Sequence, residues 1–260
     1  SNCEFPFKKI LRVCQLIPLA APAYLMTAIL QDVGSIMGFQ ISGMWWGVLI
    51  LAISTYPYVF ILTNESFNKF GINQILASRG LGAGPWKSFF KIALPMALPS
   101  FITGISLMCM EVMNELGTFE LLNIPTISTG IKENWNIDRN PNSGIALSLI
   151  ALIIVFSLIF IEKLSRRKTK RWSDNPSNTI SQSWYLKGYR SYLAIMLTSF
   201  PALFSLGVPA YWIGLNIDQL QKGFNAEIFI LTLRTLGLGL IAALLAIIFS
   251  LLVSLSSRWN

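Results

Sequence analysis

Six stretches of apolar sequence divide this 260-residue chain, and each is close to the length that a helix needs to cross a membrane. Hydrocarbon about 30 Å thick takes about 20 helical residues. Hydrophobic residues make up 53% of the chain and charged residues only 12%, whereas soluble domains carry roughly a quarter charged. Backbone groups in hydrocarbon must pair within their own segment, so we predict helices. The predicted spans are 12–31, 44–63, 95–115, 144–162, 191–213 and 228–254.

Prolines lie inside several of these spans. Pro18 and Pro22 belong to the first, Pro57 to the second, and Pro201 and Pro209 to the fifth. Proline removes a backbone N–H and kinks a helix, which membrane bundles tolerate. The predicted fold class is therefore an all-α integral membrane protein, a bundle of about six transmembrane helices, some of them kinked.

The basic residues indicate an orientation. If the segment before the first span is cytoplasmic and the spans alternate, sixteen of the twenty lysines and arginines lie on the cytoplasmic side. Such an excess marks the cytoplasmic face, and the reverse topology would invert it. We predict a cytoplasmic N-terminal segment, basic linker and C-terminus, with 116–143 outside. The net charge of +8 then reports orientation and contact with anionic membrane lipid, not a nucleic-acid partner.

The residue types argue against an enzyme or a metal centre. The sequence has no histidine, which is the commonest metal ligand and general base. Cys3, Cys14 and Cys109 form no C-x-x-C pair. A Gly-x-x-x-x-Gly-Lys-Ser/Thr loop, which would cradle ATP phosphates, is missing from the sequence. We assign no catalytic residue and no firm metal ligand.

The segment 64–94, between the second and third spans, is long for a membrane loop and has the pattern of two short helices. Apolar residues recur through 66–81 at helical spacing. Gly82 then suits a helix end, and Pro85 suits the first turn of the next helix. We predict a compact cytoplasmic helix-turn-helix that either fits a groove on a partner protein or lies against lipid headgroups.

Within this segment a run from Ala77 to Gly82 is followed, after nine residues, by Ile-Ala-Leu-Pro. This spacing resembles the EAA coupling motif of ABC importer permeases, which reads Glu-Ala-Ala, three residues, Gly, nine residues, Ile-x-Leu-Pro. Leu76 stands in place of the motif's glutamate and Ser78 in place of its second alanine. The coupling residues that the resemblance implies are Ala77, Ser78, Arg79, Gly82, Pro85, Ile92, Leu94 and Pro95.

Four short sequence segments outside the loop resemble segments of the ferric iron permeases, in which two halves are fused. They lie at 17–24, 56–59, 110–112 and 115–118. In that family each half has about six helices and its own coupling loop. The resemblance implies a piece of a longer chain, with the end of the first half in 1–165, a linker in 166–190 and the start of the second half in 191–260.

The same resemblance implies partners and a cargo. An importer of this family combines a periplasmic binding protein, a permease in the bacterial inner membrane and a cytoplasmic ABC ATPase dimer, and ATP and Mg²⁺ belong to the ATPase. We expect ferric iron as the cargo. Thiamine, an aminophosphonate, sulfate or molybdate remain alternatives, as does a secondary transporter that works without ATP.

Two acidic residues in the third span are candidates for the translocation path. Glu111 and Glu115 lie one helical turn apart on the same face, and Asn114 is their neighbour. Acids inside a span are costly and usually face an interior. They are interpreted as weak oxygen ligands for a passing hard cation. In the alternative interpretation Glu115 lies at the outer interface and Glu111 hydrogen-bonds across helices.

Overall fold

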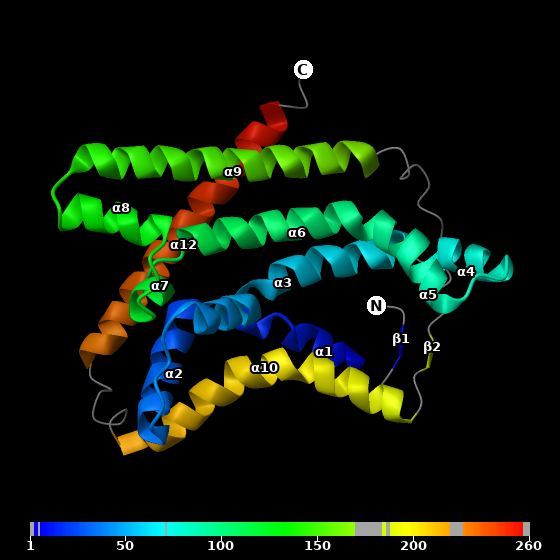
Figure 1. The fold of residues 1–260 in the computed structure, drawn as a ribbon, viewed down its shortest axis with the longest axis horizontal. Coiled ribbons are helices and arrows are strands. Elements are labelled where there is room, and N and C mark those ends of the chain that lie inside the picture. The colour runs from blue at the N-terminus through cyan, green and yellow to red at the C-terminus, as the bar shows by residue number, and fades with distance from the viewer. Residues whose placement is uncertain are drawn as a thin grey trace. The chain divides into compact units, whose positions relative to one another are not determined.

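A computed structural model describes residues 3–4, 6–70, 72–169, 184–185, 188–218 and 226–256. Figure 1 shows that nearly all of the described chain is helical. In chain order the elements are β1 (Cys3–Glu4), α1 (Lys8–Cys14), η1 (Ile17–Ala20), α2 (Ala23–Met37), α3 (Met44–Phe70), α4 (Ile72–Gly80), α5 (Pro85–Ser88), η2 (Phe89–Ala93), α6 (Leu94–Asn114), α7 (Gly117–Leu121), α8 (Ile127–Asn136), α9 (Pro141–Thr169), β2 (Trp184–Tyr185), α10 (Tyr189–Leu215) and α12 (Ala226–Ser256). The two short strands pair in parallel.

Five helical segments among the described residues are long and apolar enough to cross a membrane. They are Met44–Asn68, Pro85–Asn114, Pro141–Ser165, Ser191–Leu215 and Ala226–Leu255. Each contains one of the last five predicted spans, apart from a residue or so at an end, so the predicted all-α polytopic fold is confirmed. The predicted linker 166–190 lies mostly outside the described residues.

The first predicted span is broken, not kinked. Its two parts, Lys8–Ala20 and Ala23–Met37, meet at 85°. At the break Ala21 is extended, and Pro22 caps the second part by accepting hydrogen bonds from the N–H groups of Leu25 and Met26. Two prolines four residues apart remove successive helical donors, so the helix ends and restarts instead of bending.

The chain forms two compact units, Ser1–Ala210 and Tyr211–Asn260. In the first unit, α3, α6 and α9 run alongside one another and α8 runs alongside α9 (Figure 1). The second unit holds the end of α10 and α12, and the described side chains of α12 have no buried member. The boundary falls inside the continuous helix α10.

A core cluster joins α2, α3 and α7 in the first unit. Phe119 and Leu122, with Ile124 beyond them, are buried against Met26 and Ile50. The expectation that 116–143 lies between spans as an external segment did not include this burial. Gln31 fixes the arrangement by donating hydrogen bonds to the carbonyl oxygens of Ile41 (3.1 Å) and Leu121 (2.7 Å). As a result, α7 folds back into the bundle.

Close packing of α3 on α6 depends on Gly104. A Cβ atom at this position would lie 2.6 Å from the Cα atom of Val59, a backbone atom that cannot rotate away. We therefore expect Gly104→Ala to lower the free energy of unfolding by about 1–3 kcal/mol, the usual cost of overpacking. Thermal unfolding of the purified protein checks this. Gly237→Ala is the control, because Gly237 has open space around it; an equal loss in both variants would contradict the packing argument.

Candidate functional site

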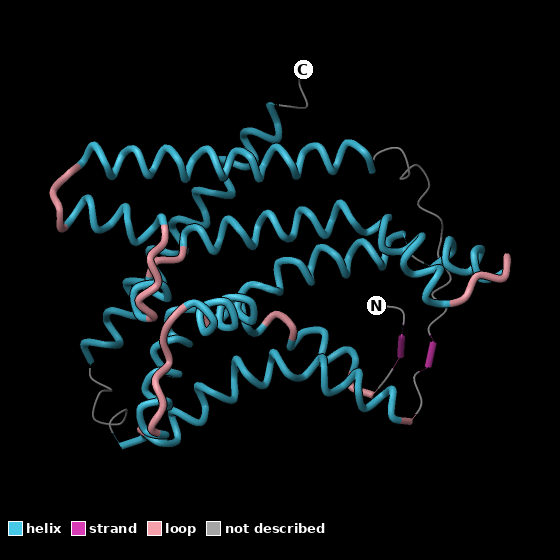
Figure 2. Tube along the Cα trace, viewed as in Figure 1, coloured by secondary structure: helices cyan, strands magenta, loops and turns pink. Residues whose placement is uncertain are grey.

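The loop that carries the spaced motif folds as a helix, a tight turn and a second helix, as predicted (Figure 2). The Ala83 N–H donates to the Ser78 carbonyl oxygen and the Gly82 N–H donates to the Arg79 carbonyl oxygen, both at 3.0 Å. This pair of bonds with a left-handed residue at Gly82 (φ 82°) is a Schellman motif. Pro85 then opens α5. Both predicted signals, the stop at Gly82 and the start at Pro85, are confirmed.

A hydrogen bond between two buried hydroxyl groups joins α4 to α5. The Oγ atoms of Ser78 and Ser88 are 2.7 Å apart, and they also reach the carbonyl oxygens of Ile75 and Gly84. A hydroxyl buried without partners would destabilise the fold. Ser78, the departure from the motif's alanine, therefore has its own partner in this chain, and the two helices are held at a fixed angle.

The second helix forms as predicted, but it does not end before the third span. α5 continues through η2, a π-helical turn, into α6, so that Pro85–Asn114 is one helical segment. In that turn the Leu94 N–H bonds the carbonyl oxygen of Phe89, five residues back. Pro95 has no N–H to give, and a wider turn before it accommodates this loss. The segment physically joins the turn after α4 to Glu111.

Large apolar side chains stand exposed around the turn. Leu81 is 90% exposed and Trp86 is 74% exposed. Trp86 stacks on Phe90, which is also exposed, at a ring distance of 6.1 Å. We call Leu81, Trp86 and Phe90 the apolar patch. It is stiff, since the neighbouring Phe89 is in edge contact with Phe90, and such aromatic groups are typical anchors of a protein interface.

The other predicted coupling residues lie around this patch. Ala77, Arg79, Pro85 and Pro95 are exposed, whereas Ile92 and Leu94 are half-buried.

Gly82 offers a local test of the turn. Alanine in the left-handed conformation costs about 1 kcal/mol or more, so we expect Gly82→Ala to raise the population of the opened turn about fivefold. The rate of limited proteolysis between α4 and α5 in membranes reports this. Gly80→Ala is the matched control, because Gly80 ends α4 with no positive φ and open space at its Cβ position. Equal cleavage of both variants would show that the left-handed conformation of Gly82 does not control opening of the turn.

A cavity of about 270 Å³ lies beside the break in the first span. The break, α3 and the end of α6 line it, and the lining residues are Pro18, Leu19, Ala21, Pro22, Ala23, Tyr24, Leu51, Ser54, Thr55, Tyr58, Glu111 and Glu115. Sequence reasoning singled out the two glutamates but not Tyr24, Ser54 or Tyr58 as site residues. The spacing of Ser54 and Tyr58, four residues apart on one face of α3, was the available signal.

The two glutamates have different surroundings. The Glu111 carboxylate accepts a hydrogen bond from Tyr58 across the cavity. Glu115 accepts a hydrogen bond from the Thr118 N–H at 2.9 Å, and so stabilises the start of α7. Asn114 is the last residue of α6 and is not among the lining residues. The structure thus brings the two predicted acids to one cavity and leaves Asn114 at its edge.

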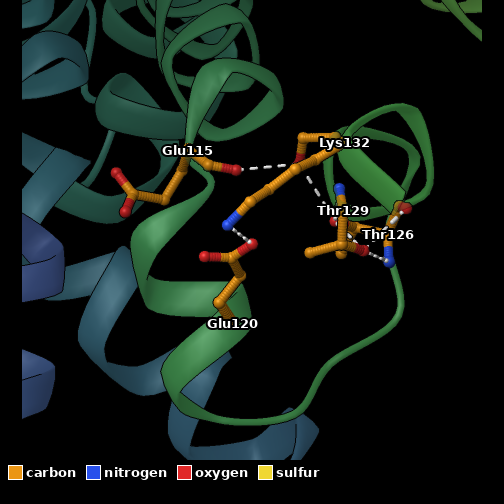
Figure 3. Close-up of polar contacts among 6 residues, drawn as sticks. Glu115, Glu120, Thr126, Thr129 and Lys132 are labelled. Atoms are coloured by element: carbon orange, nitrogen blue, oxygen red, sulfur yellow. Dashed lines mark hydrogen bonds and ion pairs between the residues drawn. The ribbon is translucent and has the colours of Figure 1, made fainter. Parts of the chain in front are cut away.

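A polar network holds the segment after Glu115. The Glu115 carbonyl oxygen accepts a hydrogen bond from the Ser128 hydroxyl at 2.9 Å. Lys132 forms an ion pair with Glu120. Figure 3 shows the Glu115 carboxylate pointing away from this ion pair. Thr126 caps α8 in a reciprocal capping box. Lys132 is therefore paired with Glu120 and not with Glu115.

The cavity is acidic and rich in oxygen. The lining residues include two glutamates, two tyrosines, Ser54 and Thr55, and none of them is lysine or arginine. Carboxylate oxygens suit hard cations, and their negative charge repels oxyanions. In the described part of the chain, no three of the residue types His, Cys, Asp and Glu come close enough to hold a metal ion.

The fold defines a multi-pass helical membrane protein with an exposed helix-turn-helix between two of its spans. Residues 3–171 match the binding-protein-dependent transport system inner membrane component family, and the chain belongs to it.

Three curated proteins illustrate the range of relatives. The chain is 22% identical to the Fe(3+)-transport system permease protein FbpB 2 of Haemophilus influenzae, over 85% of this chain and 44% of that protein. It is 28% identical to the molybdenum transport system permease protein ModB of Escherichia coli, over 65% of this chain and 82% of that protein. The sulfate transport system permease protein CysT of E. coli is 25% identical, over 44% of this chain and 45% of that protein. The chain spans less than half the length of FbpB 2.

Proposed function

We propose that this chain is part of the permease subunit of an ATP-driven importer. The apolar patch carries the proposal, because it is exposed on a fixed turn whose spacing follows the coupling motif. A cytoplasmic ABC ATPase dimer, which binds ATP and Mg²⁺, docks on this patch in a helix-in-groove contact. The chain is then a transport subunit and not an enzyme.

The orientation follows from the basic residues. Lys87 and Lys91 flank the patch, as expected for a cytoplasmic face. The N-terminal segment, the basic linker and the C-terminus share that face. α7 and α8 then lie on the periplasmic side, where a substrate-binding protein delivers the cargo.

The continuous segment Pro85–Asn114 provides the mechanical link. When ATP closes the ATPase dimer, the turn moves, and the same helical segment carries this movement to Glu111 at the cavity. Alternating access of the cavity to the two sides then follows from a tilt of α6 against α3. Acids within a span are functional candidates by default.

We further propose a hard cation, ferric iron, as the cargo. The acidic, oxygen-lined cavity supports this choice, and FbpB 2 is a relative whose name specifies Fe(3+). Oxyanion transport is the second candidate, because ModB and CysT are relatives. Two carboxylates in the lining disfavour it, since they would repel molybdate or sulfate.

The cargo is tested with the full-length permease and its candidate ATPase in proteoliposomes. ATP hydrolysis is measured with the binding protein empty, iron-loaded or loaded with molybdate or sulfate. Stimulation by the iron-loaded form alone is the expected result. Stimulation by an oxyanion-loaded form would support the importer function and contradict a cation as the cargo. Hydrolysis that no binding protein changes, in a complex shown to be assembled, would support a transporter that works without ATP.

A further inference from the structure

Gln15 is a buried amide directly after α1, and η1 separates it from the break in the first span. Only 5% of the residue is exposed. Its Nε2 atom donates to the carbonyl oxygens of Leu11, at 3.3 Å, and of Thr198 in α10. Its Oε1 atom accepts a hydrogen bond from the Tyr56 hydroxyl at 2.6 Å. One side chain therefore connects α1, α3 and α10, and its donor and acceptor groups are all in use.

Pro201 lies inside α10, three residues after Thr198, and has no N–H, so the Leu197 carbonyl lacks its usual helical donor. Backbone oxygens near a proline in a membrane helix need other donors. The Gln15 amide supplies a donor to the adjacent carbonyl, that of Thr198.

The fully buried residues of α10 are small, and Phe204 and Val208 beside them are partly buried. Ser191, Ala202 and Ser205 are the buried residues, and Thr198 lies on the same face by helical spacing. Small residues let membrane helices approach closely. The Thr198 hydroxyl bonds within its own helix, to the carbonyl oxygens of Ala194 and Ile195. The Gln15 contact therefore uses the backbone at this position and not the side chain.

We propose that Gln15 is a positioning residue that holds α10 in register on the broken first span. The family match ends at residue 171, so this contact joins the matched domain to the next membrane helix. In the importer proposed above, on which this role rests, Gln15 passes movement of the break to the part of the permease that begins with α10. Tyr56 orients the amide and acts through Gln15.

The full-length permease in nanodiscs, with its ATPase and binding protein, tests this role. Gln15→Leu introduces an apolar side chain of similar size and removes both donors and the acceptor. We expect amides of 196–206 to exchange hydrogen for deuterium about tenfold faster, the scale of one lost hydrogen bond. Basal ATP hydrolysis should be unchanged, and its stimulation by the loaded binding protein should be lost. Thr198→Val is the control, because it leaves the backbone carbonyl in place and should behave as the wild type.

Each outcome decides the role. Unchanged exchange in Gln15→Leu would overturn the proposal, as would equally fast exchange in Thr198→Val, which would indicate a packing effect. Faster exchange with stimulation intact would leave Gln15 a purely structural residue and overturn its positioning role. If the wild type itself shows no stimulation, the importer function fails, and the exchange measurement alone decides whether Gln15 holds α10.

Tyr56→Phe combined with Gln15→Leu should be no worse than Gln15→Leu alone, and additive losses would contradict action through Gln15.

Discussion

Trp86→Ala is expected to reduce ATP-driven uptake by the full-length permease to a tenth or less of the wild-type rate. Trp86 is the largest side chain of the apolar patch and is 74% exposed. Truncation of an aromatic anchor at an interface costs about 2 kcal/mol or more, which corresponds to a loss of over tenfold in affinity. Uptake into proteoliposomes is measured at a fixed, limiting ATPase concentration, and excess ATPase should restore part of the rate.

Trp45→Ala is the matched control. Trp45 is 86% exposed near the start of α3, at the end of that helix remote from the turn after α4. It should leave uptake within about twofold of the wild type, as expected for a surface change away from an interface. Equal losses in the two variants would mean that exposed tryptophans matter only for membrane insertion, and the patch would lose its assigned role.

Glu111→Gln is expected to have the second large effect, a loss of cation uptake of about tenfold or more. The change is nearly isosteric and removes one negative charge from the cavity lining, and with it part of the attraction for a cation. Tyr58 can still donate its hydrogen bond to the new amide oxygen. The loss would therefore report the charge and not the fold. The initial rate of iron uptake is measured with saturating binding protein and ATP.

Glu115→Gln separates the roles of the two acids. The Glu115 carboxylate already accepts the Thr118 N–H, and an amide oxygen can accept the same bond. A loss of less than about threefold is expected, since the hydrogen bond from Thr118 is kept. A larger loss in Glu115→Gln than in Glu111→Gln would contradict our assignment of cargo contact to Glu111. Faster uptake of molybdate or sulfate in Glu111→Gln would favour an oxyanion cargo.

The local features of the coupling loop were predictable because they depend on neighbours in the sequence. Gly82 and Pro85 fix a turn through their own backbone preferences, and the structure forms that turn. Pro95 misled the prediction, since a proline after a short apolar run resembles the start of a new helix. The π-helical turn that accommodates Pro95 depends on a hydrogen bond to a carbonyl five residues back. No simple periodicity in the sequence predicts such a bond.

The cavity depends on contacts that sequence alone does not specify. Glu111 meets Tyr58 because Gly104 lets α6 approach the backbone of α3 at Val59. The prolines of the first span predicted a kink, whereas the 85° break that opens space beside α3 needs both of them together with an extended Ala21. Burial of α7 likewise follows from tertiary packing, because its short sequence resembles an external loop.

Site-specific photo-crosslinking tests the central claim most directly. A photoreactive amino acid is placed at Leu81, at the tip of the apolar patch, in the full-length permease assembled with its ATPase and binding protein. Ile137, at the end of α8 and 72% exposed, is the matched position predicted to lie on the opposite side of the membrane. Our account predicts a crosslink from 81 to the ATPase and none from 137 to it. A crosslink to the ATPase from 137, or none from 81 in an assembled complex, would contradict both the docking surface and the orientation.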